Sequence, residues 1–144
     1  MSWENLNLGE IASNDKAPQA APPPEGTYIM RLLGVKNSQF VAGRYDFDFV
    51  IDEGQYKGRR VFPTLPEPTG PDHWAAKAAA RFLYKVLGGD QQEGETPIVA
   101  LSRMAAGQPK FTAPLVHVTY KSVKEGGEVT KADLKQWFSL EASA

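Results

Sequence analysis

The sequence contains no cysteine among its 144 residues. Disulfide bonds, thiol nucleophiles and cysteine-based metal sites are therefore excluded. Long apolar runs are also missing, because stretches such as 97–106 fall far short of the ~20 residues that a membrane-spanning helix needs. The N-terminus carries acidic residues where a signal peptide would be basic. We therefore expect a protein without an export signal or membrane anchor, located in the cytoplasm.

Residues typical of catalytic sites are scarce. The two histidines, His73 and His117, lie far apart in the sequence and have no neighbouring carboxylate pair at metal-ligand spacing. No Gly-x-x-x-x-Gly-Lys-Ser/Thr stretch is present to hold phosphates, and neither Ser38 nor Ser102 has the flanking glycines of a nucleophile elbow. We predict that the protein is not an enzyme and uses neither a metal nor another cofactor.

Net charge is also low, at −1, which on its own speaks against a nucleic-acid partner. The charge is nevertheless distributed unevenly along the chain. Residues 1–25 contain Glu4, Glu10, Asp15 and Glu25 against Lys16, so the remaining residues hold a small excess of basic side chains. The predicted folded part is therefore mildly basic, and the distribution matters more than the sum.

The first 25 residues are rich in proline and alanine, and proline disfavours both helices and central strands. We predict a flexible arm over 1–25 and one domain over 26–144. Trp3, Leu6 and Leu8 can either pack back onto this domain or anchor a partner protein.

Strand-forming residues dominate the next part of the chain, and we predict strands over 26–35, 44–52 and 59–62. The second strand alternates most clearly, with four apolar side chains on one face and Asp46 and Asp48 on the other. A turn bounded by two glycines, Gly54 and Gly58, joins it to the third strand. Prolines from Pro63 onward then stop the sheet.

Helical periodicity follows, and it predicts a helix over 72–88 capped by Asp72 and a shorter one over 98–106 that starts at Thr96-Pro97. Strand signals return at 111–121, and a turn at 125–128 leads to a last predicted strand over 134–140. Three strands, a helical insert and a closing hairpin form the element order of the OB-fold. We therefore predict a mainly β fold with a helical insert: a five-stranded Greek-key barrel with a helix between strands 3 and 4.

Four stretches of the chain, which together touch about half of it, carry a resemblance to a known family. They are 3–6, 24–28, 49–62 and 79–88. The most specific part is the sequence Gly-Gln-Tyr-Lys-Gly-Arg-Arg-Val-Phe at 54–62. Here the chain resembles phage-encoded OB-fold single-stranded DNA-binding proteins, a family formerly described as a domain of unknown function. The resemblance implies a role in DNA replication, recombination or repair in an infected bacterial host. The long acidic C-terminal tail through which many relatives recruit replication partners is absent from this sequence.

Binding to single strands needs cations along the phosphate path and exposed rings on which bases stack. The predicted basic contacts are Lys57, Arg59, Arg60, Arg31, Arg44, Lys110 and Lys121. The predicted stacking rings are Phe62, Tyr56, Tyr120 and Trp137. Each cation can instead belong to a solvated charge cluster, and each ring can instead belong to the core. Asp46 and Asp48 would repel phosphate if their face of the strand met the nucleic acid.

Two functional hypotheses follow. The first is binding of single-stranded DNA with little sequence preference, with self-association along the DNA and replication or recombination proteins as further partners. The second is a small-barrel module for protein interaction or inhibition of a host enzyme, in which the N-terminal arm docks the partner and no nucleic acid is bound.

Overall fold

A computed structural model describes residues 3–8, 22–122 and 126–142 of the chain. The strands are β1 (Gly26–Asn37), β2 (Tyr45–Ile51), β3 (Arg60–Val61), β4 (Thr64–Leu65), β5 (Lys110–Ser122), β6 (Gly127–Leu134) and β7 (Glu141–Ala142). The helical segments are η1 (Trp3–Asn5), α2 (Trp74–Arg81), the π-helical turn η2 (Phe82–Val86), α3 (Pro97–Ala105) and η3 (Trp137–Ser139).

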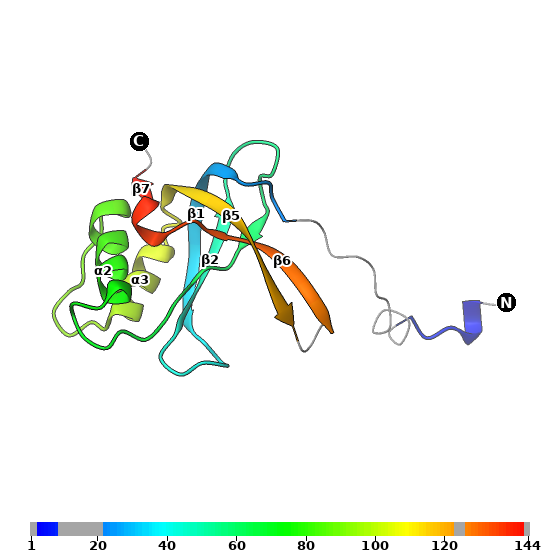
Figure 1. Cartoon of the computed structure of the whole chain (residues 1–144), viewed down its shortest axis with the longest axis horizontal. Coiled ribbons are helices and arrows are strands. Elements are labelled where there is room, and N and C mark those ends of the chain that lie inside the picture. Colours follow the sequence, from blue (N-terminus) through cyan, green and yellow to red (C-terminus); the bar gives the residue numbers. More distant parts are fainter. Residues whose placement is uncertain (1–2, 9–21, 123–125, 143–144) are drawn as a thin grey trace.

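The strands pair into one antiparallel sheet with the order β3-β2-β1-β5-β6, while β4 pairs with β2 and β7 pairs with β5. The sheet curves into a nearly closed barrel, and α2, η2 and α3 lie between β4 and β5 in the chain. Figure 1 shows α2 and α3 side by side at one side of the sheet, while the β5–β6 hairpin extends away from them. The mainly β barrel predicted from the sequence is confirmed at this level. The sheet has seven strands where we predicted five, and the Greek-key connection and the helix between strands 3 and 4 stay predictions.

The core lies between the sheet and the helices. Alternation along β2 buries Phe47, Phe49 and Ile51 toward the helices, as predicted. Their rings join a cluster with Phe82 and Phe111, in which neighbouring ring centroids lie 4.6–6.0 Å apart. Edge-to-face contacts of this kind stabilise a core beyond the area they bury.

Both predicted helical regions are helical in the structure, although the first differs in detail. Its cap is His73, whose Nδ1 accepts the backbone N–H of Ala75, and not Asp72 as we predicted. The α-helical hydrogen bonding gives way to η2 before Gly88, whose φ of +67° ends the run. The second helix begins at Pro97, where the missing N–H of proline leaves no helical bond unmade.

The last predicted strand, 134–140, is wrong. The partner of β5 is β6, which ends at Leu134, and the following residues form the short helix η3. The apolar residues on which this prediction rested cover the core instead. Leu134 and Leu140 are buried, and so is Trp137, which is 8% exposed. The sequence could not separate these two arrangements, because a short apolar run fits a buried turn as well as a strand.

A β-bulge at Leu33 changes the phase of β1. Before it Met30 and Leu32 face the core, and after it Val35 pairs with Phe47 on the core side. The extra residue therefore turns Lys36 to the face away from the helices.

The segment just before β1 is attached to the sheet. Pro23 is buried, its carbonyl oxygen lies 2.6 Å from His117 Nε2, and a carboxylate oxygen of Glu25 accepts the backbone N–H of His117. Contacts of the folded part thus begin before Gly26, where we placed the domain boundary. Residues 9–21 of the predicted arm lie outside the described residues.

The burial of Trp137 generates a stability prediction. Its indole N–H donates to the carbonyl oxygen of Thr64 and its ring packs 4.7 Å from that of Phe47. Trp137→Ala should therefore lower the free energy of unfolding by about 3–5 kcal/mol in urea titrations, the usual cost of removing a large core ring. Phe62→Ala, which truncates an exposed ring, should change it by no more than about 0.5 kcal/mol. Equal effects of the two substitutions would contradict this burial.

Candidate functional site

A groove of about 530 Å³ lies on the face of the sheet that points away from the helices, which we call the helix-free face. Its walls come from β1, β2, β4, β6 and the residues that flank them. The charged and polar side chains that line it are Lys36, Arg44, Asp46, Asp48, Thr64 and Lys131, and the aromatic ring of Phe62 joins them.

Three cations from three different segments meet in this groove. Lys36 is placed by the bulge in β1, Arg44 precedes β2, and Lys131 comes from β6. The curvature of the sheet brings β6 close to β1 and β2 here, since Lys131 lines the same cavity as Gly34 and Asp48. The groove therefore presents positive charge from two sides.

Carboxylates on the same face are engaged by arginines. Arg44 Nε donates to Asp46 Oδ1 at 2.9 Å, and Arg60 Nη1 donates to Asp48 Oδ2 at 2.7 Å. The repulsion of phosphate that we expected from Asp46 and Asp48 is thus largely cancelled by their partners. Lys36 is exposed and makes no ion pair with the described residues, so its charge remains available.

A second set of basic residues crosses the sheet beside the groove. Lys110 on β5, Arg31 on β1 and Arg60 on β3 occupy one row, because Arg31 pairs with both Lys110 and Val50, and Val50 pairs with Arg60. Arg31 and Lys110 both contact Asp52, which lies one position beyond the end of β2. Hydrogen bonding from Arg31 in particular holds the pKa of Asp52 below its usual value, and Lys110 adds to the effect.

The turn after β2 has the geometry that its glycines predicted. Gly54 and Gly58 adopt φ values of +89° and +91°, which suit glycine. The turn is closed by the N–H of Gly58, which donates to the carbonyl of Ile51. It presents the exposed Lys57, and beside it lies Arg59, which is half-buried.

The predicted stacking rings divide into two groups. Phe62 is 58% exposed at the groove and Tyr120 is 45% exposed on the β5–β6 hairpin, so both can offer a face to a base. Tyr56 is half-buried and packs edge-on against Tyr28, and Trp137 lies in the core. Trp137 is therefore corrected from a stacking candidate to a core residue.

The hairpin aligns Tyr120 with the groove. Tyr120 and Lys131 lie on the same face, and Lys131 Nζ lies 5.7 Å from the Tyr120 ring centroid, a cation–π distance. Lys121 is exposed but points to the opposite face of the hairpin, where it pairs with Glu128 across the strands. The structure thus places Lys121 away from the groove.

Three residues of this region were not predicted from the sequence. The bulge in β1 determines the face on which Lys36 lies, and β6 determines that of Lys131, but neither the bulge nor β6 was predicted. The third, Phe40, is 88% exposed in the loop between β1 and β2, which Ser38 holds by accepting the backbone N–H groups of Phe40 and Val41. Only the apolar pair Phe40-Val41 in an otherwise polar loop signals it in the sequence.

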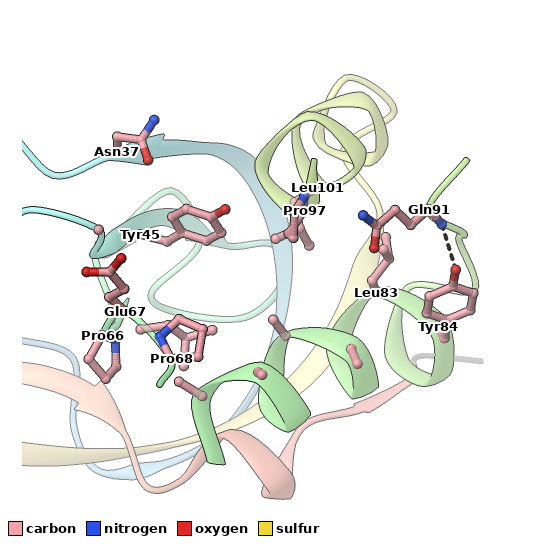
Figure 2. A pocket seen from close by; sticks show the side chains of 16 residues that line it. Asn37, Tyr45, Pro66, Glu67, Pro68, Leu83, Tyr84, Gln91, Pro97 and Leu101 are labelled. Atoms are coloured by element: carbon pink, nitrogen blue, oxygen red, sulfur yellow. Dashed lines mark hydrogen bonds between the residues drawn. The ribbon is translucent and has the colours of Figure 1, made fainter. Parts of the chain in front are cut away.

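A different cavity, of about 430 Å³, lies between the helices and the edge of the sheet (Figure 2). Alanines of α2, Pro97 and Leu101 of α3, and Tyr45 line it, and its one charged lining residue is Glu67. Tyr84 closes one end, where its hydroxyl accepts the N–H of Gln91 (Figure 2). An apolar cavity with a carboxylate and no cation in its lining does not suit a phosphate backbone.

Within the described ranges, no group of three or more histidine, aspartate or glutamate side chains could hold a metal ion. No helix in the same part of the chain is long and apolar enough to cross a bilayer.

Comparisons with known proteins identify no relative. No protein-family model, no curated protein and no solved structure matches the chain.

The ion pairs of Asp52 generate a pH prediction. Because its pKa in the folded state lies below the usual 3.8, Asp52 stabilises the fold above that pH. Asp52→Asn should therefore lower the melting temperature at pH 7, and the difference from wild type should shrink as the pH falls below 3.8 toward the lower pKa of the folded state. Calorimetry at pH 7 and pH 3 measures this. Glu53→Gln, at an exposed neighbour, should have little effect at either pH, and an Asp52→Asn effect independent of pH would contradict the assignment.

Proposed function

We propose that this protein binds single-stranded DNA with little sequence preference, through basic contacts to phosphates and aromatic stacking of bases. The observation that carries the proposal is the groove on the helix-free face. There Lys36, Arg44 and Lys131 converge from separate segments beside the exposed ring of Phe62. Cations along a backbone path together with accessible rings are the combination by which proteins hold single strands.

The strand order supports the same proposal. β1 pairs with β2 on one side and with β5 on the other, and β5 continues into the hairpin with β6. This arrangement is compatible with an OB-fold, in which the face of strands 2 and 3 and two flanking loops bind oligonucleotides. In this chain the corresponding surface is the helix-free face, flanked by the loop that contains Phe40 and by the β5–β6 hairpin.

We propose a path for the strand across this face. Phosphates follow Lys131, Lys36 and Arg44 through the groove and continue toward the basic row of Arg60, Arg31 and Lys110. Phe62 and Tyr120 offer stacking surfaces beside the groove, and Lys57 and Arg59 extend the positive charge at the other end of β2. The arginines that pair with carboxylates can contact a phosphate with donors that their pairs leave unused.

The resemblance to phage proteins extends the proposal to a cellular role. In that role the protein coats transient single strands during phage DNA replication, recombination or repair, in the cytoplasm of the infected bacterium. Duplex DNA would be a poor ligand, because its bases are stacked on each other and cannot stack on the protein's rings.

A second candidate function rests on the apolar cavity beside α2 and α3. A cavity of this size with a largely apolar lining is typical of sites for a small molecule or a partner side chain. It favours the alternative of a protein-interaction module. A deletion of residues 1–21 tests the arm-docked form of this alternative, since DNA binding should persist without the arm while an arm-dependent interaction should disappear.

The proposal predicts tight binding of a fluorescent oligo-dT that weakens steeply as salt rises and that duplex DNA fails to compete. Fluorescence anisotropy at a series of salt concentrations measures this. No binding even at low salt would contradict the proposed function.

Charge-removing substitutions test where the strand lies. The double variant Lys36→Ala/Lys131→Ala should weaken binding and flatten the dependence of log K on log salt by about 0.7 for each phosphate that the protein no longer neutralises. The matched control, Lys77→Ala/Lys85→Ala, removes the same charge from exposed positions on α2 and η2. It should leave the slope unchanged, and equal slopes for both double variants would place the strand elsewhere.

A further inference from the structure

One carboxylate oxygen in the groove has no hydrogen-bond partner. Asp48 Oδ2 accepts from Arg60, but Asp48 Oδ1 is buried and receives no hydrogen bond from the described residues. Other acidic side chains on this face differ, since Asp46 Oδ1 accepts from Arg44, and Asp52 contacts both Arg31 and Lys110. A buried carboxyl oxygen without a hydrogen-bond donor destabilises the free protein, so it demands an explanation.

The surroundings of Asp48 indicate what kind of donor it takes. Asp48 lines the groove together with the exposed ring of Phe62. A base stacked on Phe62 would have its edge directed along the groove wall. Carboxylates recognise nucleobases by accepting from exocyclic amino groups, as between aspartate or glutamate and N4 of cytosine.

We infer that Asp48 Oδ1 accepts a hydrogen bond from the exocyclic amino group of a base stacked on Phe62, so that the groove prefers amino-bearing bases over thymine. The inference rests on the proposed function and adds a specificity determinant to it. Thymine carries the carbonyl oxygen O4 where cytosine carries its N4 amino group, and a carboxylate repels that oxygen. The result is a modest preference within a largely sequence-independent site.

The side chains that line the groove beside Asp48 can rearrange. The Asp48 side chain as a whole is 31% exposed, although Oδ1 itself is covered. Phe62 and Lys131, which line the groove with it, are not in the core and can shift without moving the sheet. The ion pair of Lys131 with Asp133 is long, at 3.7 Å, so a phosphate can replace that partner.

The test compares oligo-dC with oligo-dT of equal length, because the two pyrimidines are of similar size and differ at the amino group. Anisotropy at pH 8, where cytosine N3 is unprotonated, should show roughly tenfold tighter binding of oligo-dC, the lower end of what one hydrogen bond to a charged group contributes. Equal affinity for both, or tighter binding of oligo-dT, would overturn the inference. Failure to bind either oligomer would instead overturn the proposed function, so the two failures are distinguishable.

Asp48→Asn sharpens the test. Arg60 needs an acceptor, so the amide oxygen should turn to Arg60 and the amide NH₂ should take the place of Oδ1. An acceptor in the groove thereby becomes a donor, and the preference should invert toward oligo-dT, whose O4 accepts. An unchanged preference for oligo-dC in this variant would overturn the assignment to Asp48.

Two controls accompany this variant. Asp46→Asn removes the same charge from the same groove, but at a residue whose Oδ1 is already bonded, so it should keep the wild-type preference. Thermal melting shows whether the Asp48→Asn protein is folded, and if it is not, the dC to dT ratio of the wild-type protein decides the question.

Discussion

The two-residue alternation of β2 is the constraint on which the rest of the structure depends. β2 is paired along both edges, by β1 on one side and by β3 and β4 on the other, so it cannot rotate about its axis. The helices cover one of its faces and bury Phe47 and Phe49 there. Asp46 and Asp48 must then point to the other face, whatever their electrostatic cost.

That cost explains the arrangement of cations on the helix-free face. Each carboxylate that β2 presents draws an arginine from the same face, with Arg44 beside Asp46 and Arg60 beside Asp48. The same pairing occurs just past the end of β2, where Arg31 and Lys110 hold Asp52. Because these acids are engaged, positive charge from residues such as Lys36 dominates locally although the whole chain carries a net charge of −1.

The elements predicted correctly are those whose signal is local. The alternation in β2, the glycines of the turn after it and the Thr96-Pro97 helix start each act within a few residues, and each has its expected structure. These local signals placed Arg44 and Phe62, which line the groove. They also placed Arg60, which forms an ion pair with Asp48. The barrel followed from the order of these elements.

The features that the sequence did not predict depend on contacts between distant segments. The bulge at Leu33 satisfies the core, because it turns Val35 inward beside Phe47, and no local pattern marks it. Its consequence is that Lys36 faces the groove. Likewise β6 is polar along much of its length, since the hairpin extends beyond the helices, so its alternation was hidden and Lys131 was missed.

The placement of Trp137 shows how the two faces depend on each other. We predicted this ring on the binding surface, but the core needs a large ring against Phe47 and Phe82. Its indole N–H also donates a hydrogen bond to the backbone carbonyl of Thr64, and Thr64 lines the groove on the opposite face of the sheet. Trp137 therefore acts on the groove indirectly, because it holds β4 against β2 from the core side. Large aromatic residues thus stabilise the sheet from one face, and the charged side chains lie on the other face.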